Sequence, residues 1–159
     1  MRILGIDPGY ATIGFGVVEY DGYNFTPIKY GAITTEPTVQ FHLRLKTIYD
    51  DMNIVLSQYK PDSMAIEKLF FNTNHKTVID VSQARGVILV AAANLNVPIY
   101  EYTPLQVKQS VVGYGRAEKI QVMEMTRQIL KLNTIPRPDD AADALAIAIC
   151  HGHSAGRGF

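Results

Sequence analysis

Two acidic side chains each end a short apolar run at a point where the chain turns. Asp7 follows the apolar residues 3–6 and comes directly before Pro8-Gly9, and Glu67 ends the run 63–67. Apolar runs of this kind are typical of central strands, and open α/β sheets place their chemistry at the carboxyl ends of such strands. An acid at a strand end is more often a turn former than a catalyst, so neither residue alone indicates an active site.

Two further acids lie at the start of the last predicted helix. Asp140 and Asp143 are three residues apart and share one helix face, and alanines at 141, 142, 144 and 146 would let that helix pack closely on a sheet. Acids in a first turn also favour the positive end of the helix dipole, so capping alone could explain the pair. We interpret the preceding Asp139 as a cap, although it could substitute as a ligand.

The four acids would share one chemistry if the fold brought them to a single point: Asp7, Glu67, Asp140 and Asp143. Clustered carboxylates repel one another and raise each other's pKa values. Hard divalent cations relieve this repulsion because they prefer oxygen ligands. Two magnesium ions about 4 Å apart could then clamp the attacking and leaving oxygens of a phosphodiester.

The first part of the chain predicts an antiparallel meander, then a helix, then a strand. The expected strands are residues 3–7, 12–20, about 25–35 and 63–67. Asp21-Gly22 is a strong hairpin signal between the second and third of these. Apolar residues then recur at spacings of three and four up to Tyr59, which predicts an amphipathic helix with Thr38 as its N-cap.

The second part of the chain alternates helices with one more strand. The expected elements are helices at 76–96, 104–112, 117–132 and 139 to about 151, and a strand at 97–102. A helix followed by a short strand is typical of a βαβ unit, in which the two strands lie parallel. The predicted fold class is therefore α/β, with a five-stranded mixed sheet (three antiparallel strands and then parallel ones) flanked by helices.

Length and composition predict one packed domain. The chain has 159 residues, 47% of them hydrophobic, and we place the domain at 1–152 with a flexible C-terminal tail at 153–159. Its one cysteine, Cys150, excludes an internal disulfide, and no apolar stretch approaches the ~20 residues that cross a bilayer. We therefore expect a cytoplasmic protein with no membrane partner.

The charge of the chain is balanced overall but not locally. Fifteen basic and 15 acidic side chains give a net charge of zero, which alone argues mildly against a nucleic-acid partner. Residues 104–131 hold five basic and two acidic side chains, a local excess of three (5 − 2). This local excess of positive charge is compatible with a partner that carries phosphates.

Six strings occur in order over nearly the whole chain: ILGIDPG at 3–9, AIE at 65–67, QARGV at 83–87, QVKQSVVG at 106–113, AEK at 117–119 and DAADALA at 140–146. Together they resemble one family, the bacterial RuvC-type Holliday junction resolvases of the ribonuclease H-like superfamily. The resemblance implies a ribonuclease H-like fold. It also implies a homodimer that binds four-way junction DNA and nicks two opposing strands symmetrically, leaving 5′-phosphate and 3′-hydroxyl ends.

The resemblance also assigns residues and partners. By motif position, the catalytic residues would be Asp7, Glu67, Asp140, Asp143, Lys108 and Lys119. The four acids would hold two Mg²⁺ per subunit, for which Mn²⁺ could substitute. The predicted DNA contacts are Phe70, Lys76, Arg85, Lys108, Arg116 and Lys119. The branch-migration complex of RuvA and RuvB would act with the protein.

Other interpretations stay open at this point. A related nuclease acting on structured RNA would carry the same acids, and a non-catalytic scaffold would bind junctions without cleaving them. Either Phe70 or Phe71 could face DNA. The apolar helix segment 83–95 suits a dimer interface, but burial inside one subunit would explain it equally well. The segment 150–153 offers three soft-metal ligands without a fourth nearby, so we favour a neutral helix end over a zinc site.

Overall fold

A five-stranded mixed sheet forms the centre of the computed structural model, which describes residues 1–69 and 75–156. Its strands are β1 Arg2–Asp7, β2 Thr12–Tyr20, β3 Phe25–Thr34, β4 Ser63–Glu67 and β5 Ile99–Tyr102. They lie in the order β3-β2-β1-β4-β5, with β1–β2 and β2–β3 antiparallel and β1–β4 and β4–β5 parallel. The predicted fold class and strand arrangement are confirmed.

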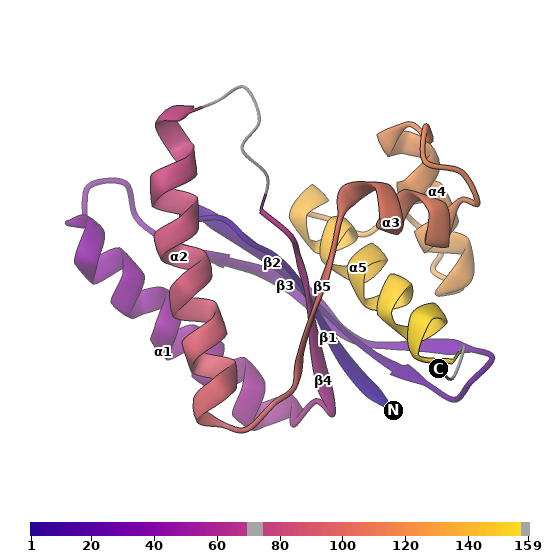
Figure 1. Cartoon of the computed structure of the whole chain (residues 1–159), viewed down its shortest axis with the longest axis horizontal. Coiled ribbons are helices and arrows are strands. Elements are labelled where there is room, and N and C mark those ends of the chain that lie inside the picture. The colour runs from indigo at the N-terminus through magenta and orange to yellow at the C-terminus, as the bar shows by residue number, and fades with distance from the viewer. Residues whose placement is uncertain (70–74, 157–159) are drawn as a thin grey trace.

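Helices cover both faces of the sheet (Figure 1). They are α1 Phe41–Tyr59, α2 His75–Asn94, α3 Pro104–Val111, α4 Lys119–Ile129 and α5 Asp139–Ala155. One apolar core joins the sheet to α1 and α2, and a second joins it to α3, α4 and α5. Among the described residues, no helix is long and apolar enough to cross a bilayer.

The core under α1 and α2 is built from large aliphatic side chains. Successive strand residues point to opposite faces, so β1 and β4 each send alternate residues into this core. Fully buried members include Leu4, Ile6, Met64 and Ile66 from the strands and Ile48, Met52 and Ile88 from the helices. The intervening strand residues, among them Asp7 and Glu67, therefore face α5.

On the face covered by α5, β1 and β2 carry glycine where the helix crosses them. A methyl group on Gly5 would overlap the main-chain oxygen of Ala144, and a methyl group on Gly14 would overlap that of Asp140. The predicted close packing of the alanine-bearing helix on the sheet is confirmed. This close approach brings the first turns of α5 beside the carboxyl end of β1.

Several element ends differ from the sequence prediction. Helix α1 begins after Gln40 and not after Thr38, and Gln40 makes no side-chain cap hydrogen bond. Helix α2 ends at Asn94 because Asn96 has a left-handed backbone with φ of 56°, which stops the helix short of the predicted end. Helix α4 begins after Glu118, which forms a capping box with Gln121.

Helix α5 is longer than predicted and ends at Ala155. Gly152, whose residue type predicts a helix stop, lies against the ring of Phe25, and a methyl group there would overlap that ring. His151 is only 3% exposed. The expected helix end at about His151 is therefore wrong, because packing against β3 supports a further turn. The division of the chain at residue 152 stays a prediction.

Candidate active site

Three of the predicted acids lie together at the carboxyl end of β1. One carboxylate oxygen each from Asp7, Asp140 and Asp143 lies within 4.8 Å of the other two, and all three residues are half-buried. Asp7 pairs with Gly14 across β1 and β2. Because Gly14 lets α5 pack closely on β2, the start of α5 also lies close to Asp7. The spacing of Asp140 and Asp143 on one helix face then presents both to Asp7.

The electrostatics of this cluster penalise ionisation. The pKa of Asp7 is raised from its ordinary 3.8 to about 8, first by burial and then by the negative charges of Glu67, Asp143 and Asp140, with a side-chain hydrogen bond to Asp140 adding to the shift. Burial also raises the pKa of Asp143, against the charge of Lys119. Without a cation, the cluster therefore favours a proton on Asp7 at neutral pH.

The donor set of the cluster fits a hard divalent cation. It offers carboxylate oxygens only, on a rigid strand end and a closely packed helix, at mutual distances of up to 4.8 Å. A bound cation would replace the proton and remove the charge repulsion that raises the pKa of Asp7. Asp7, Asp140 and Asp143 are thus able to hold a metal such as Mg²⁺.

Glu67, the fourth predicted acid, lies near the cluster but outside the group of three. Burial and then the charge of Asp143 raise the pKa of Glu67, and the positive charge of Lys108 opposes them. Glu67 ends β4, which pairs directly with β1. Its carboxylate thus acts on Asp7 through its charge, from the neighbouring strand.

Both predicted catalytic lysines lie beside the acids. Nζ of Lys119 is 3.5 Å from Oδ2 of Asp143, and the Lys119 side chain is 60% exposed. A cleft of about 260 Å³ is lined by residues of β4, α3, α4 and α5, among them Glu67, Asp143, Lys108 and Lys119. Two of the acids and both amines therefore line one cleft, an arrangement suited to a phosphate ester near a bound cation.

Asp139 does not cap α5. The N-cap is Pro138, which has no side-chain cap hydrogen bond, and Asp139 is the first helical residue. Its carboxylate pairs with the guanidinium of Arg137. The interpretation of Asp139 as a cap is therefore wrong, and Asp139 is not a member of the three-acid group.

The remaining predicted DNA contacts differ in their surroundings. Arg116 is exposed in the connection between α3 and α4. Lys76 is in the first turn of α2, but its side chain lies outside the described residues, as do Phe70 and Phe71. Their predicted roles, including which phenylalanine faces DNA, stay predictions.

Arg85 lies in a different environment from Arg116. Its side chain is 13% exposed and contacts two groups of the protein, the main-chain oxygen of Glu67 and the carboxylate of Glu101. Sequence reasoning missed Glu101 entirely. The sequence did offer one signal for this pair. Glu101 is a charged residue within a short strand, and such a residue must be exposed to solvent or paired with an opposite charge.

The segment around Cys150 does not form a metal site. Sγ of Cys150 donates to the main-chain oxygen of Gln106, and Nδ1 of His151 lies 2.6 Å from the hydroxyl of Tyr102. Burial lowers the pKa of His151, which favours the neutral ring. In the described part of the chain, the acids at Asp7 are the only group with metal-binding geometry. His151 is neutral but buried within α5, so its expected place near the helix end is wrong.

The sequence from β1 into α5 matches one known family. A model of the family described as crossover junction endodeoxyribonuclease RuvC matches residues 3–151. The chain belongs to this RuvC family. The predicted resemblance is confirmed, and by its family the chain is an endodeoxyribonuclease that acts on crossover junctions.

Individual relatives match over nearly their full lengths. The crossover junction endodeoxyribonuclease RuvC of Caldanaerobacter subterraneus subsp. tengcongensis is 58% identical, over 97% of this chain and 93% of the relative. The structure of Thermus thermophilus RuvC superposes with a TM-score of 0.93 at 38% identity and covers 99% of this chain and 97% of that one. A structure of the same T. thermophilus protein in complex with Holliday junction substrate has a TM-score of 0.91 at 36% identity, with the same coverage.

Proposed function

We propose that this RuvC-family chain resolves four-way DNA junctions by symmetric, metal-dependent nicking that leaves 5′-phosphate and 3′-hydroxyl ends. The observation that carries the proposal is the group of half-buried carboxylates formed by Asp7, Asp140 and Asp143. The similarity to T. thermophilus RuvC, whose structure was solved with a Holliday junction, supports the choice of substrate.

In this proposal, Asp7, Asp140 and Asp143 hold Mg²⁺, with Glu67 completing a site for two ions per subunit and Mn²⁺ able to substitute. When bound, the ions supply Lewis-acid activation of water and of the phosphodiester. The protein fixes the ligands in place, because Asp7 ends a central strand and α5 rests against glycines of β1 and β2. Such rigid placement favours alignment of the attacking oxygen with the scissile phosphorus.

Lys108 and Lys119, which line the same cleft, bind the phosphate. Lys119 pairs with Asp143 at 3.5 Å, and the charge of Lys108 acts on Glu67. Both amines can stabilise the negative charge that develops on the phosphate oxygens in the transition state. Arg116, which is exposed nearby in the chain, extends the basic surface toward the DNA.

A homodimer would place two such sites on one junction. Helices α1 and α2 leave an apolar groove of about 550 Å³ whose lining includes Leu45, Tyr49, Val87 and Val90. Ile79 and Val90 on α2 are 66% and 53% exposed. Exposed apolar surface of this kind is typical of interaction sites. We assign it to a second copy of the chain, which would give the two symmetric nicks their geometry.

The cellular setting follows from the same proposal. The free thiol of Cys150 is buried, and an internal disulfide is impossible with one cysteine, which suits a reducing cytoplasm. The junctions to be cleaved would be those handled by the branch-migration complex of RuvA and RuvB.

The test is Asp7→Asn, assayed for junction binding and for magnesium-dependent nicking. Nicking should fall by at least about a thousandfold, roughly 4 kcal/mol, because the substitution removes a ligand charge from the cluster. Junction affinity should change less than about threefold, since phosphate contacts dominate it. Near-normal nicking by the variant would refute the proposed site.

Asp21→Asn is the matched control. Asp21 is an exposed acid in the turn between β2 and β3 whose carboxylate accepts hydrogen bonds from the main-chain amides of Tyr23 and Asn24, and an asparagine oxygen can accept the same bonds, so nicking should stay within about twofold. Structured RNA serves as the second substrate. Faster cleavage of that RNA than of a DNA junction would contradict the choice of substrate, and junction binding without cleavage by the unaltered protein would contradict catalysis itself.

A further inference from the structure

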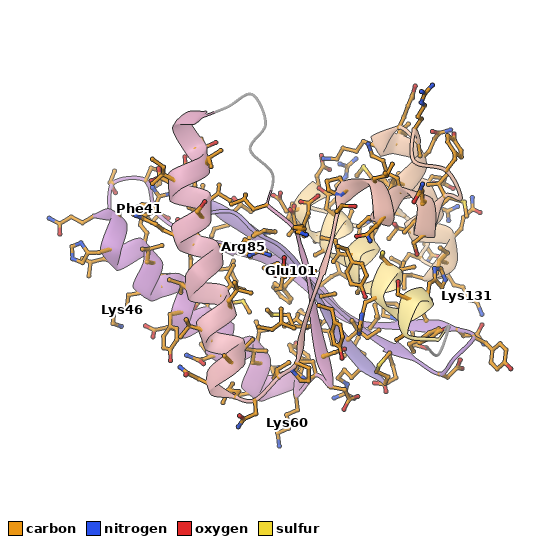
Figure 2. The ribbon with its side chains drawn as sticks, viewed as in Figure 1. Phe41, Lys46, Lys60, Arg85, Glu101 and Lys131 are labelled. Atoms are coloured by element: carbon orange, nitrogen blue, oxygen red, sulfur yellow. The ribbon has the colours of Figure 1, made fainter. Side chains whose placement is uncertain are left out.

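Arg85 is a basic residue whose guanidinium is turned into the protein. Nε donates a hydrogen bond to the main-chain oxygen of Glu67 at 3.3 Å, and Nη2 lies 3.3 Å from Oε2 of Glu101. The side chain is 13% exposed, and Nη2 is buried without a hydrogen-bond partner, so its contact with Glu101 is an ion pair. Figure 2 shows Arg85 and Glu101 next to each other between α2 and the strands. A phosphate outside the protein could reach little of this guanidinium.

The contact reaches Glu67 from the face opposite to its carboxylate. Ile66 pairs with Glu101 across β4 and β5, and Ile66 belongs to the core under α1 and α2. Side chains alternate along a strand, so the Glu67 carboxylate points to the other face, toward the acids. Arg85 therefore holds the peptide of Glu67 from behind, while its carboxylate faces the site.

The end of β4 has a second attachment on its other side. The amide of Lys68 donates to the main-chain oxygen of Tyr102 at 2.8 Å. The oxygen of Glu67 accepts from Arg85. The last peptide of β4 is thus fixed by one bond to β5 and one to α2. Glu101 in turn orients the guanidinium from β5.

We infer that Arg85 is a positioning residue for the Glu67 carboxylate and not a DNA contact, with Glu101 holding the guanidinium in place. The inference rests on the proposed function, since it assumes that Glu67 helps to bind a metal. Glu67 lies outside the group of three acids. Its contribution to metal binding therefore depends on how closely the end of β4 holds its carboxylate to that group. The planar guanidinium can serve a carbonyl and a carboxylate at once, whereas a lysine ammonium offers no such fork.

The experiment measures Mn²⁺ affinity by calorimetry and junction affinity as a function of salt in EDTA, on the full-length protein. Arg85→Met should weaken Mn²⁺ binding about tenfold, the order expected when a group that orients a ligand is lost. Its junction affinity and salt slope should be unchanged. Arg85→Lys should also bind Mn²⁺ more weakly, because it keeps the charge but loses the fork.

Arg127→Met is the matched control. Arg127 on α4 also serves one carboxylate and one main-chain oxygen, those of Glu124 and Leu132. Its loss should lower the melting temperature as Arg85→Met does, while Mn²⁺ affinity stays within about twofold of normal. The comparison separates a general loss of packing from a loss of ligand position.

A direct DNA contact predicts the opposite pattern. Arg85→Met would then lower junction affinity and reduce the salt slope by about 0.9, Arg85→Lys would restore both, and Mn²⁺ affinity would not change. Those results would overturn the inference. If Arg85→Met does not fold, Glu101→Gln replaces it, and weaker Mn²⁺ binding with unchanged junction affinity supports positioning. Tighter junction binding with unchanged Mn²⁺ affinity would overturn it, because removing an acid beside a DNA-binding arginine should favour DNA.

Asp7→Asn in the same calorimeter separates the two proposals. Loss of Mn²⁺ binding in Asp7→Asn together with normal binding in Arg85→Met would refute the role of Arg85 alone. Normal Mn²⁺ binding in Asp7→Asn would refute the proposed metal site, whatever Arg85 does.

Discussion

The face of the sheet under α1 and α2 presents large aliphatic side chains, whereas the face under α5 presents glycines at the crossing points. Ile6 and Ile66 keep the first pair of helices away from the strand backbones. Gly5 and Gly14 let the backbone of α5 touch them. Bulky side chains can repack around a small change, but two backbones in contact cannot. The fold thus places its acids on the face where helix position is most tightly constrained.

The largest expected effect on stability comes from adding one methyl group at this contact. Gly14→Ala would place that methyl group on the main-chain oxygen of Asp140 and push the start of α5 away from Asp7. We expect a loss of about 3 kcal/mol or more in unfolding free energy and at least a hundredfold slower nicking, of the order that ligand displacement causes. Urea unfolding and a junction-nicking assay measure both.

Gly31→Ala is the corresponding change on the opposite face. Gly31 lies on β3, where an added methyl group would come 3.3 Å from the ring of Phe15, a side chain that can shift slightly. Its unfolding free energy should change by less than about 1 kcal/mol. Equal losses in the two glycine variants would refute the idea that the two faces differ in tolerance.

The pH dependence of stability tests the acid-bearing face alone. Asp7 binds a proton more tightly when folded, with a pKa of about 8 against 3.8, so metal-free protein should lose stability as pH rises between those values. Between about pH 6.5 and pH 8, the loss should reach up to about 2 kcal/mol. Thermal unfolding in EDTA should show this loss, and added Mg²⁺ should reverse it.

Asp7→Asn is the control for this pH effect. Its side chain cannot ionise, so the variant should be more stable than the unaltered protein in EDTA near pH 8 and should gain less from Mg²⁺. His151 contributes a slope of opposite sign. Its lowered pKa means that stability is lost as pH falls below about 6.5. If Asp7→Asn loses as much stability as the unaltered protein between about pH 6.5 and pH 8, a group other than Asp7 causes that loss.

The features that depend on local residue type could be predicted from the sequence. Glycines in β2 and alanines in α5 indicate that a helix packs closely on the sheet, because only small residues permit it. The places of Asp7 and Glu67 at the ends of β1 and β4 could be predicted, because each acid directly follows an apolar run. The convergence of Asp7, Asp140 and Asp143 is then a consequence of strand order and register.

Features that depend on a distant partner could not be predicted. Gly152 has the residue type of a helix stop, but the ring of Phe25 in β3 packs there and α5 continues. Arg85 has the charge expected of a DNA contact, and its pairing with Glu101 of β5 and its exposure of only 13% depend on a strand that comes later in the chain. In both cases a remote segment sets the surroundings of the residue, and residue type carries no information on that segment.

A smaller effect is expected from removing one methyl group on the aliphatic face. Ile88 on α2 is fully buried among large side chains, so Ile88→Val should cost about 1 kcal/mol of unfolding free energy. Nicking at a temperature well below the melting point should stay within about twofold. A large loss of nicking would show that this core also adjusts the acids.

The smallest stability effects should come from two ion pairs, one on each side of the sheet. Lys46 and Asp50 lie 2.7 Å apart on α1, and Lys119 and Asp143 lie 3.5 Å apart at the cleft. Both lysines are mostly exposed, so Lys46→Gln and Lys119→Gln should each change the unfolding free energy by about 0.5 kcal/mol or less. Of the two, only Lys119→Gln removes a charge that faces the phosphate in the proposed function, so it should slow nicking at least tenfold with little change in junction affinity. If Lys119→Gln nicks as fast as the unaltered protein, the pair of Lys119 and Asp143 is an ordinary surface contact. Lys108 would then be the only amine of the cleft with a role in nicking.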